Sequence, residues 1–422
     1  MARFYHAHRI DLQKCDGQMK CMRSCPTQAI RVKNGKAAFS EDLCVDCGTC
    51  LSACQSGAMV PITDPLEDFS KFKYKVVVPA AVLYSQFDSS VHPYIIHKAL
   101  KKLGFDEVVD LNFSTAVLGN VLMKYLSTYK GPLPLISSHC PALIRLIQVK
   151  YPELIKHIIP LDVPRELTAR EIRKTLPKKL GLKPEEIGIT YIASCPAKIV
   201  SIKQPAEKTK SWFDGVLSIK DVFSLLYPHV LTIKENFDES EVPDDFSFSI
   251  SWARLGGIIN AVKMENWIAV SGLDHVMKVL DDIENSRLRN IEFVEAMTCM
   301  LGCIGGPYNV ENAYIARANI IKQSIKHETS IEVDEDEISR NYDKGYYFFE
   351  NAILPRPTKY FDTDLVTSIK RIKERDRVYQ KLPKIDCGCC GAPTCLAFAE
   401  DFVRGETELS DCVILAQKLS NS

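Results

Sequence analysis

Through the middle of the chain, short apolar runs typical of buried strands alternate with amphipathic stretches typical of helices. This alternation predicts an α/β protein. Short apolar runs predict buried strands at residues 76–82, 107–111, 133–136, 187–193, 215–219, 267–270 and 291–294. Amphipathic stretches predict helices at residues 93–103, 120–129, 164–180, 220–226 and 273–284, with a further helix beginning at Pro141. This alternation indicates parallel or mixed sheets covered by helices.

The two ends of the chain have different patterns. Residues 29–39 alternate around Asn34-Gly35, which predicts a β-hairpin. Residues 61–73, with two prolines and mixed charges, are expected to form a linker. A second break at residues 355–358 precedes a charged amphipathic helix predicted at 362–381 and another helix at 398–405.

Composition narrows the class of protein. The 422 residues carry no net charge, with 46% hydrophobic and 25% charged residues, which leaves room for two or three globular domains. We therefore expect neither nucleic acid nor a membrane surface as a partner. No run of about eighteen apolar residues predicts a membrane span, and the N-terminal residues lack a signal core and a twin-arginine pair, so we expect a cytoplasmic location. Sixteen cysteines then indicate metal binding rather than disulfides.

The central part of the chain carries three cysteine motifs. Cys299 and Cys303 lie four residues apart, so a helical turn would place both thiolates on one face, and nearby glycines allow a close approach to the backbone. Cys140 and Cys195 each follow a predicted strand and precede a proline that suits the first position of a helix. These patterns bring four thiolates to strand ends, where open α/β sheets usually place their sites.

The three motifs resemble, in order, the three H-cluster signature motifs of FeFe-hydrogenases. The resemblance implies that the four cysteines hold a 4Fe–4S cubane, and that Cys303 bridges it to a diiron centre with CO and CN ligands. It also implies that Lys198 hydrogen-bonds a cyanide on the distal iron and that Met297 lies near the bridging ligand. The implied fold is a two-lobed α/β H-cluster domain.

The N-terminal cysteines follow the spacing of bacterial ferredoxins, in which the fourth cysteine of each motif serves the other cluster. One 4Fe–4S site is therefore predicted from Cys44, Cys47, Cys50 and Cys25. The other site has only Cys15, Cys21 and Cys54, because Gln18 stands where a second cysteine is expected. It could hold a 3Fe–4S cluster, take an oxygen ligand from Gln18 or water, or take an imidazole from His6 or His8.

The C-terminal cysteines form a third group, Cys387, Cys390, Cys395 and Cys412. Their spacing resembles a 4Fe–4S module found in electron-transfer and corrinoid-linked proteins of anaerobes and in sensory hydrogenases. Cys389 is an additional thiol that could compete for a ligand position.

The proton-transfer groups implied by the resemblance are largely missing. His139 stands where high-turnover family members have a second cysteine, and Ser201 stands where they have a glutamate. Residues 111–131 contain no Asp or Glu. His139 could replace the proton donor, because imidazole titrates near neutral pH, or it could only hydrogen-bond near the cluster. Slow turnover is expected.

The resemblance implies three domains: a ferredoxin-like α+β domain at 1–65, an H-cluster domain at 73–354 and a small, mostly helical 4Fe–4S domain at 355–422. The expected function is that of a slow FeFe-hydrogenase, which interconverts H2 with protons and electrons and serves H2 or redox sensing. The alternative is a hydrogenase-like iron–sulfur protein without the diiron subsite, acting in iron–sulfur assembly or electron transfer. Expected partners are ferredoxin or a signalling protein and the hydrogenase maturation proteins. Homodimer formation is left open.

Overall fold

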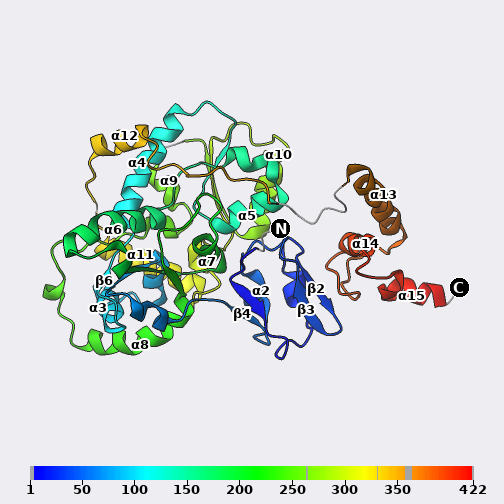
Figure 1. Cartoon of the computed structure of the whole chain (residues 1–422), viewed down its shortest axis with the longest axis horizontal. Helices are drawn as coiled ribbons and strands as arrows, with labels where there is room; N and C mark the ends of the chain where they lie inside the picture. The colour runs from blue at the N-terminus through cyan, green and yellow to red at the C-terminus, as the bar shows by residue number, and fades with distance from the viewer. Residues whose placement is uncertain (1–3, 263–264, 330, 357–363, 421–422) are drawn as a thin grey trace. The chain divides into compact units, whose positions relative to one another are not determined.

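The middle of the chain forms two parallel β-sheets in the computed structural model (Figure 1). The first sheet has the order β6 (Glu107–Val108), β5 (Tyr74–Pro79), β8 (Ile187–Ala193) and β9 (Gly215–Ser218). The second has the order β10 (Trp267–Ser271), β11 (Phe293–Met297) and β7 (Leu135–Ile136). Every residue of β8 is buried, as expected for a continuous apolar run in a sheet covered on both faces. The predicted α/β class is confirmed.

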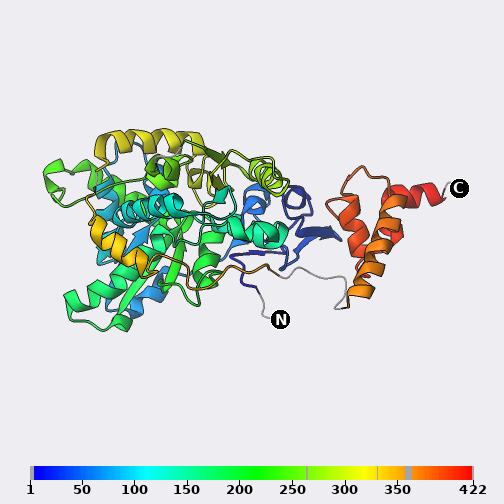
Figure 2. The ribbon, with the colours of Figure 1, turned by 90° about the horizontal axis from the view of Figure 1, so that it is seen from above.

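Ten helices of the described chain surround these sheets. They are α3 (Pro93–Lys102), α4 (Asn112–Thr128), α5 (Pro141–Lys150), α6 (Pro164–Leu180), α7 (Pro196–Lys203), α8 (Ile219–Glu235), α9 (Gly257–Ala261), α10 (Leu273–Glu284), α11 (Ala313–His327) and α12 (Glu335–Asp343). Helix α3 packs against α8, and α12 lies beside α4 in both ribbon views (Figures 1 and 2).

Tertiary contacts explain where the helices differ from the predicted bounds. Helices α6 and α10 have the predicted bounds, whereas α4 begins at Asn112 rather than at residue 120. The Asn112 side chain is buried and accepts a hydrogen bond from the backbone of Ser249 at 2.9 Å. This contact comes from a distant part of the chain, and no local periodicity could reveal it.

The structure describes residues 4–262, 265–329, 331–356 and 364–420, and these fall into two units. The central unit is Thr63–Leu354, and the cysteine-rich unit joins the chain up to Ile62 with the chain from Pro355. The predicted linker at 61–73 packs largely on the central unit, because the Asp64 carboxylate accepts the backbone N–H of Val216 and the ammonium of Lys203, both at 2.7 Å. Residues 66–71 of this stretch form a 3₁₀ helix.

The N-terminal part of the cysteine-rich unit contains two small antiparallel ribbons and two short helices. Strand β1 (His8–Ile10) pairs with β4 (Met59–Pro61), and β2 (Ile30–Lys33) pairs with β3 (Lys36–Phe39). Helices α1 (Lys20–Arg23) and α2 (Thr49–Ala53) lie between strands in the sequence. The predicted hairpin turn is confirmed, with Asn34 and Gly35 both at positive φ.

The C-terminal part of the same unit is helical, with α13 (Leu365–Lys381), α14 (Cys395–Val403) and α15 (Val413–Ser420). Residues 362–363 of the predicted helix lie outside the described residues. The backbone N–H of Val32 donates to the carbonyl of Gly391 at 2.9 Å, and Arg31 Nη2 donates to Asp401 at 3.0 Å. The C-terminal segment therefore docks on the β2–β3 hairpin.

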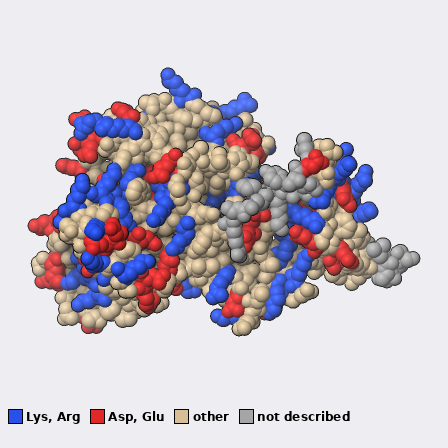
Figure 3. Space-filling view, viewed as in Figure 1, with Lys and Arg blue, Asp and Glu red and all other residues tan. Residues whose placement is uncertain are grey.

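Charge is distributed without a dominant sign on the face shown in Figure 3, where Lys and Arg side chains are interspersed with Asp and Glu. This agrees with the zero net charge of the sequence. None of the helices in the described part of the chain combines the length and apolarity needed to span a bilayer.

Candidate hydrogenase-type iron–sulfur site

The fold places the cysteines of the central unit after the carboxyl ends of parallel strands. Cys140 directly precedes α5 and Cys195 directly precedes α7, each with a proline at the first helical position. The strands before them, β7 and β8, belong to different sheets. Cys299 and Cys303 follow β11, which pairs with β7. Loops from both sheets therefore contribute to one site.

The four thiols of this site interact electrostatically with one another. Burial raises the pKa of Cys299 well above its usual value, and the charges of Cys195, Cys140 and Cys303 raise it further. Burial also raises the pKa of Cys195, and Cys303 and Cys140 add to that rise. Four thiolates held together in a buried place require positive charge, which an iron–sulfur cluster supplies.

The segment that joins Cys299 to Cys303 is a turn rather than the α-helical turn expected from the spacing. Leu301 has φ 61° and Gly302 has φ 80°, and Cys303 begins a single 3₁₀ turn. A Cβ on Gly302 would lie 2.8 Å from Met297 Sδ, and one on Gly306 would lie 2.5 Å from a backbone carbonyl oxygen. The glycines allow the backbone to pack closely around the cysteines.

Lys198 is buried beside Cys303. Its ammonium nitrogen lies 3.1 Å from Cys303 Sγ and donates to Ser194 Oγ at 3.1 Å. Burial acts to lower the pKa of Lys198, but the negative charges of Cys303, Tyr191 and Cys195 outweigh it and raise the pKa overall. Lys198 is therefore held as a cation next to the sulfur that the resemblance assigns as the bridging ligand.

His139 also lies beside this sulfur. Its Nε2 is 4.0 Å from Cys303 Sγ, and its ring meets that of Trp252 edge to face with centroids 5.9 Å apart. Burial lowers the pKa of His139 to about 3, and the charges of Lys198 and Arg165 contribute to the fall. The imidazole is consequently neutral at physiological pH, and its buried Nδ1 has no hydrogen-bond partner.

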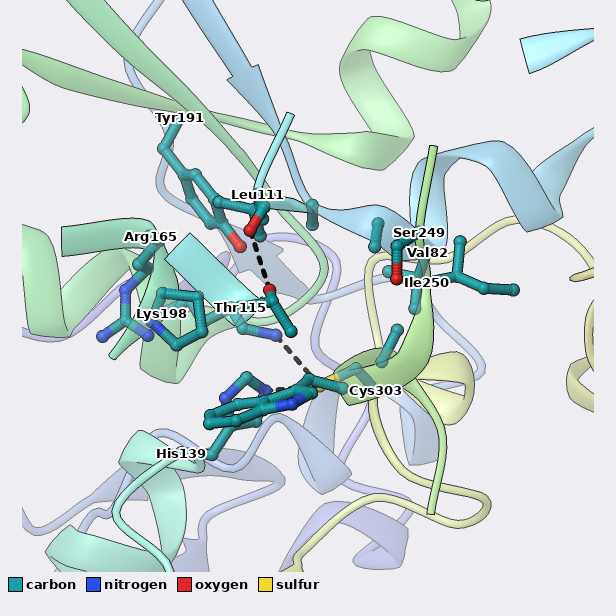
Figure 4. A pocket seen from close by; sticks show the side chains of 15 residues that line it. Val82, Leu111, Thr115, His139, Arg165, Tyr191, Lys198, Ser249, Ile250 and Cys303 are labelled. Atoms are coloured by element: carbon teal, nitrogen blue, oxygen red, sulfur yellow. Dashed lines mark hydrogen bonds between the residues drawn. The ribbon is translucent and has the colours of Figure 1, made fainter. Parts of the chain in front are cut away.

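A cavity of about 480 Å³, including its open mouth, adjoins these groups (Figure 4). Its ionisable lining residues are His139, Arg165, Tyr191, Lys198 and Cys303, and the described lining contains no Asp or Glu. Residues 111–131 contain no Asp or Glu, and the described residues that line this cavity contain none either. Two buried donors among these lining residues, Arg165 Nε and Trp252 Nε1, have no partner, and His139 Nδ1, whose role depends on the tautomer, has none either.

Sequence reasoning missed Arg165 and Trp252. Arg165 is the second residue of α6 and is one of many charged residues in that predicted helix. Trp252, like Trp212 and Trp267, was expected to be a core residue rather than a cofactor contact. Met297, in contrast, is buried in the apolar core next to Gly302 and is not among the described residues that line this cavity.

Glu295 supports the loop that carries Trp252. Its buried carboxylate accepts the backbone N–H groups of Gly256, Ile258 and Ile259 at 2.9, 3.1 and 3.0 Å. Burial raises the pKa of Glu295 to about 7, although these donors oppose the rise. Glu295, the acidic residue of the third motif, therefore holds a loop beside the cavity and is not among the described residues that line it.

In the cysteine-rich unit, the structure brings together the four cysteines of the predicted complete cluster. Burial raises the pKa of Cys50 well above its usual value, with further contributions from Cys47 and Cys25. Cys44 is buried and has Cys50 and Cys47 as charged neighbours. His8 Nε2 lies 3.8 Å from Cys44 Sγ.

The three cysteines of the incomplete site also lie together. Burial raises the pKa of Cys21, and the charges of Cys54 and Cys15 add to it. These residues line a small cavity with Asp16 and Gln18, and Gln18 Nε2 donates to Asp16 at 2.6 Å. A ligand from His6 or His8 does not fit this site, because His6 bonds to Asp46 and His8 lies against Cys44, both at the complete cluster. A non-protein ligand, an oxygen ligand or a three-iron cluster fits.

The C-terminal cysteines form the third group. Burial raises the pKa of Cys390, and the charges of Cys412 and Cys387 contribute. Cys395 and Cys412 are buried in one apolar cluster, whereas Cys389 is exposed. Of the four predicted ligands, Cys395 and Cys412 are buried and Cys387 and Cys390 are half-buried, whereas the additional thiol faces solvent.

Comparison with known proteins identifies the family. The family model for the iron only hydrogenase large subunit, C-terminal domain, matches residues 73–266 and 232–307, which together span more than half of the chain. A 4Fe–4S dicluster domain matches residues 7–55, and an Fe–S cluster family matches residues 382–414. The chain belongs to the iron-only (FeFe) hydrogenase family, and the recognition made from the three motifs is confirmed.

Individual relatives include both enzymes and assembly factors. Iron hydrogenase 1 of Clostridium pasteurianum is 21% identical over 55% of this chain, and the chain covers half of that protein's length. The cytosolic Fe–S cluster assembly factor NAR1 of Botryotinia fuckeliana is 26% identical over 31% of this chain and 24% of that protein. Among solved structures, a single-residue variant of the FeFe-hydrogenase HydA1 from Chlamydomonas reinhardtii gives a TM-score of 0.49 at 16% identity, covering 69% of this chain and 98% of that one.

Proposed function

We propose that this protein is an FeFe-hydrogenase that interconverts H2 with two protons and two electrons slowly and serves H2 or redox sensing. Cys140, Cys195, Cys299 and Cys303 would hold a 4Fe–4S cubane, with Cys303 also holding a diiron group. When bound, the diiron group would supply the Lewis-acidic iron at which H2 reacts. The flanking clusters would exchange electrons with a redox partner such as ferredoxin or a signalling protein.

The observation that carries this proposal is the position of Lys198 at the cavity. A cubane alone needs four cysteines. A buried lysine 3.1 Å from Cys303 Sγ, beside a cavity whose lining residues include two unpartnered buried donors, fits an additional group with anionic or hydrogen-bond-accepting ligands. The donors and the acceptor-rich CO and CN ligands are complementary.

The residues around the cavity favour slow proton movement. His139 stays neutral at pH 7, and its Nε2 lies 4.0 Å from Cys303 Sγ. It could pass a proton as a neutral donor or only hydrogen-bond the sulfur. With no carboxylate in the described lining of the cavity, delivery from solvent lacks the groups that usually raise the rate about 10²- to 10⁴-fold.

A second candidate function is iron–sulfur assembly or electron transfer with a cubane alone. The likeness to NAR1 assembly factors favours it, because these proteins are similar to part of this chain and are not named as hydrogenases. This candidate leaves the cationic cavity without a ligand.

Infrared spectroscopy separates the two candidates. Protein purified anaerobically is supplied with a synthetic diiron precursor, and spectra are recorded before and after H2 is admitted. Sharp CO and CN bands that move under H2 are the expected result. Absence of these bands while 4Fe–4S absorption is intact would overturn the hydrogenase proposal and support the cubane-only protein.

A further inference from the structure

Arg165 is a buried cation at the candidate site that neither the three motifs nor their resemblance assigns. It is the second residue of α6, is 4% exposed, and lines the cavity with Lys198 and His139 (Figure 4). A buried guanidinium is costly unless its donors are satisfied. Its surroundings therefore indicate what it binds.

Only part of the Arg165 guanidinium is held by the protein. Nη2 donates to Ser201 Oγ at 3.0 Å, and Ser201 in turn donates to the backbone carbonyl of Lys198 at 2.8 Å. Nε is buried and has no hydrogen-bond partner. Ser201 thus fixes the head of Arg165 on the helix that carries Lys198, and leaves a donor unsatisfied.

Glu207 accounts for only part of this arrangement. It interacts electrostatically with Arg165, and the two residues line a neighbouring cavity together with Ser201, but Glu207 also interacts with the cation of Lys208. Glu207 is not among the residues that line the cavity containing Lys198 and Cys303. On the side of that cavity, the described lining offers two cations and no carboxylate.

We propose that Arg165 is a second cationic hydrogen-bond donor, beside Lys198, to the anionic iron-bound ligands of the group held in this cavity, with Ser201 positioning it. This inference rests on the proposed function. The ligand class is a small anion carried on a metal, such as cyanide. A guanidinium suits this role because it stays charged when buried and presents several N–H groups in a fixed plane.

The test uses the full-length protein loaded anaerobically with the synthetic diiron precursor. The variants are Arg165→Met, Arg165→Lys and Ser201→Ala, and Arg145→Met is the matched control. Arg145 is also a buried arginine, and it lines the neighbouring cavity with Arg165 and Glu207. It donates to the carbonyl of Gln204 and does not line the cavity with Lys198, so it separates the effect of that cavity from the loss of a nearby buried charge.

The readouts are the CN and CO infrared frequencies and the amount of diiron group left after repeated gel filtration. Arg165→Met is expected to shift at least one CN band and to lose the group about tenfold faster, since a charge-assisted hydrogen bond contributes roughly that factor. Arg165→Lys should fall between this variant and the parent. Ser201→Ala should shift the CN band less than Arg165→Met, and Arg145→Met should match the parent.

The outcomes distinguish this inference from the function on which it rests. If the parent shows CN and CO bands and Arg165→Met retains the same frequencies and the same rate of loss, Arg165 only balances Glu207 and the inference is wrong while the function stands. If the parent shows no bands, both are overturned. Should Arg165→Met fail to fold, the CN frequencies of Arg165→Lys and Ser201→Ala decide, and parental values in both would overturn the inference.

Discussion

The Lys198 ammonium lies 3.1 Å from Cys303 Sγ, so one buried cation faces the sulfur at the edge of the cavity. Lys198→Met removes this cation and leaves the thiolate with less positive charge around it. We expect the cubane to assemble, and the CO and CN bands obtained with the diiron precursor to fall about tenfold or more relative to cubane absorption. Lys203→Met, on the same helix but bonded to Asp64, is the control and should keep full bands.

His139 provides a test of the missing proton donor. His139→Cys places a thiol next to Cys140, and we expect H2 turnover to rise about a hundredfold or more if proton delivery limits the rate. His139→Ala, which supplies no donor, is the control for a purely steric effect and should not accelerate. Equal rates for the parent and His139→Cys would show that another step is limiting.

The low pKa of His139 has its own consequence for pH dependence. With a pKa lowered to about 3, the imidazole does not change charge between about pH 5 and 8. The turnover rate of the parent should therefore show no step near pH 6.5, the value for an exposed histidine. A step near that pH that disappears in His139→Ala would contradict the buried, neutral assignment.

Glu295 makes stability depend on pH in the opposite sense to an exposed acid in an ion pair. Its folded-state pKa of about 7 lies above the ordinary 4.5, so the folded protein retains a proton that the unfolded chain releases. Stability should fall as pH rises from about 4.5 to about 7, by up to about 3 kcal/mol. Thermal unfolding of the parent and of Glu295→Gln between pH 5 and 8 measures this. A parallel pH profile in the two proteins would refute it.

Gly391 and Gly405 form a matched pair for testing the docking of the C-terminal segment. Both have positive φ, but a Cβ on Gly391 would lie 2.0 Å from the Val32 carbonyl oxygen, whereas one on Gly405 would meet no atom within 4 Å. Gly391→Ala should release the segment and make it more sensitive to limited proteolysis than Gly405→Ala does. Similar cleavage of the two variants would show that the contact with Val32 contributes little.

The incomplete N-terminal site predicts a cluster that loses iron readily. Gln18 stands where a thiolate is expected, and its side chain is exposed and bonded to Asp16. Gln18→Cys should supply the fourth thiolate. The oxidised variant should then retain more iron than the oxidised parent and show no EPR signal of a three-iron cluster. Gln18→Ala, which adds no ligand, should behave as the parent does. Retention of four irons at this site in the oxidised parent would contradict the prediction.

Much of the fold could be predicted, because its signals are local. The apolar run Ile187–Ala193 followed by Cys195-Pro196 predicted a strand, a site and a helix from adjacent residues alone. The grouping of cysteines could also be predicted, because ferredoxin spacing determines which thiols share a cluster. The turn after Cys299 was expected to be helical, since spacing does not reveal positive φ at Leu301.

The walls of the cavity could not be predicted, because they depend on distant contacts. Arg165 looks like one charge of many on α6, and only its burial and its bond to Ser201 distinguish it. Trp252 reaches the cavity on a loop held by Glu295, which lies on a strand far along the chain. Periodicity reports which face of an element is buried, and it carries no information about which distant groups face one another.

The pairing of β7 with β11 has a consequence for biosynthesis. Leu135 pairs with Phe293, so the strand that precedes Cys140 gains this neighbour only after the chain has been translated through β11. At ribosomal rates of about 5–20 residues per second, Cys140 waits roughly 10–30 s before its strand partner emerges. Metal delivery to the four central cysteines therefore has to follow synthesis of nearly the whole central unit, and during this interval the early thiols depend on protection from oxidation and from incorrect metals.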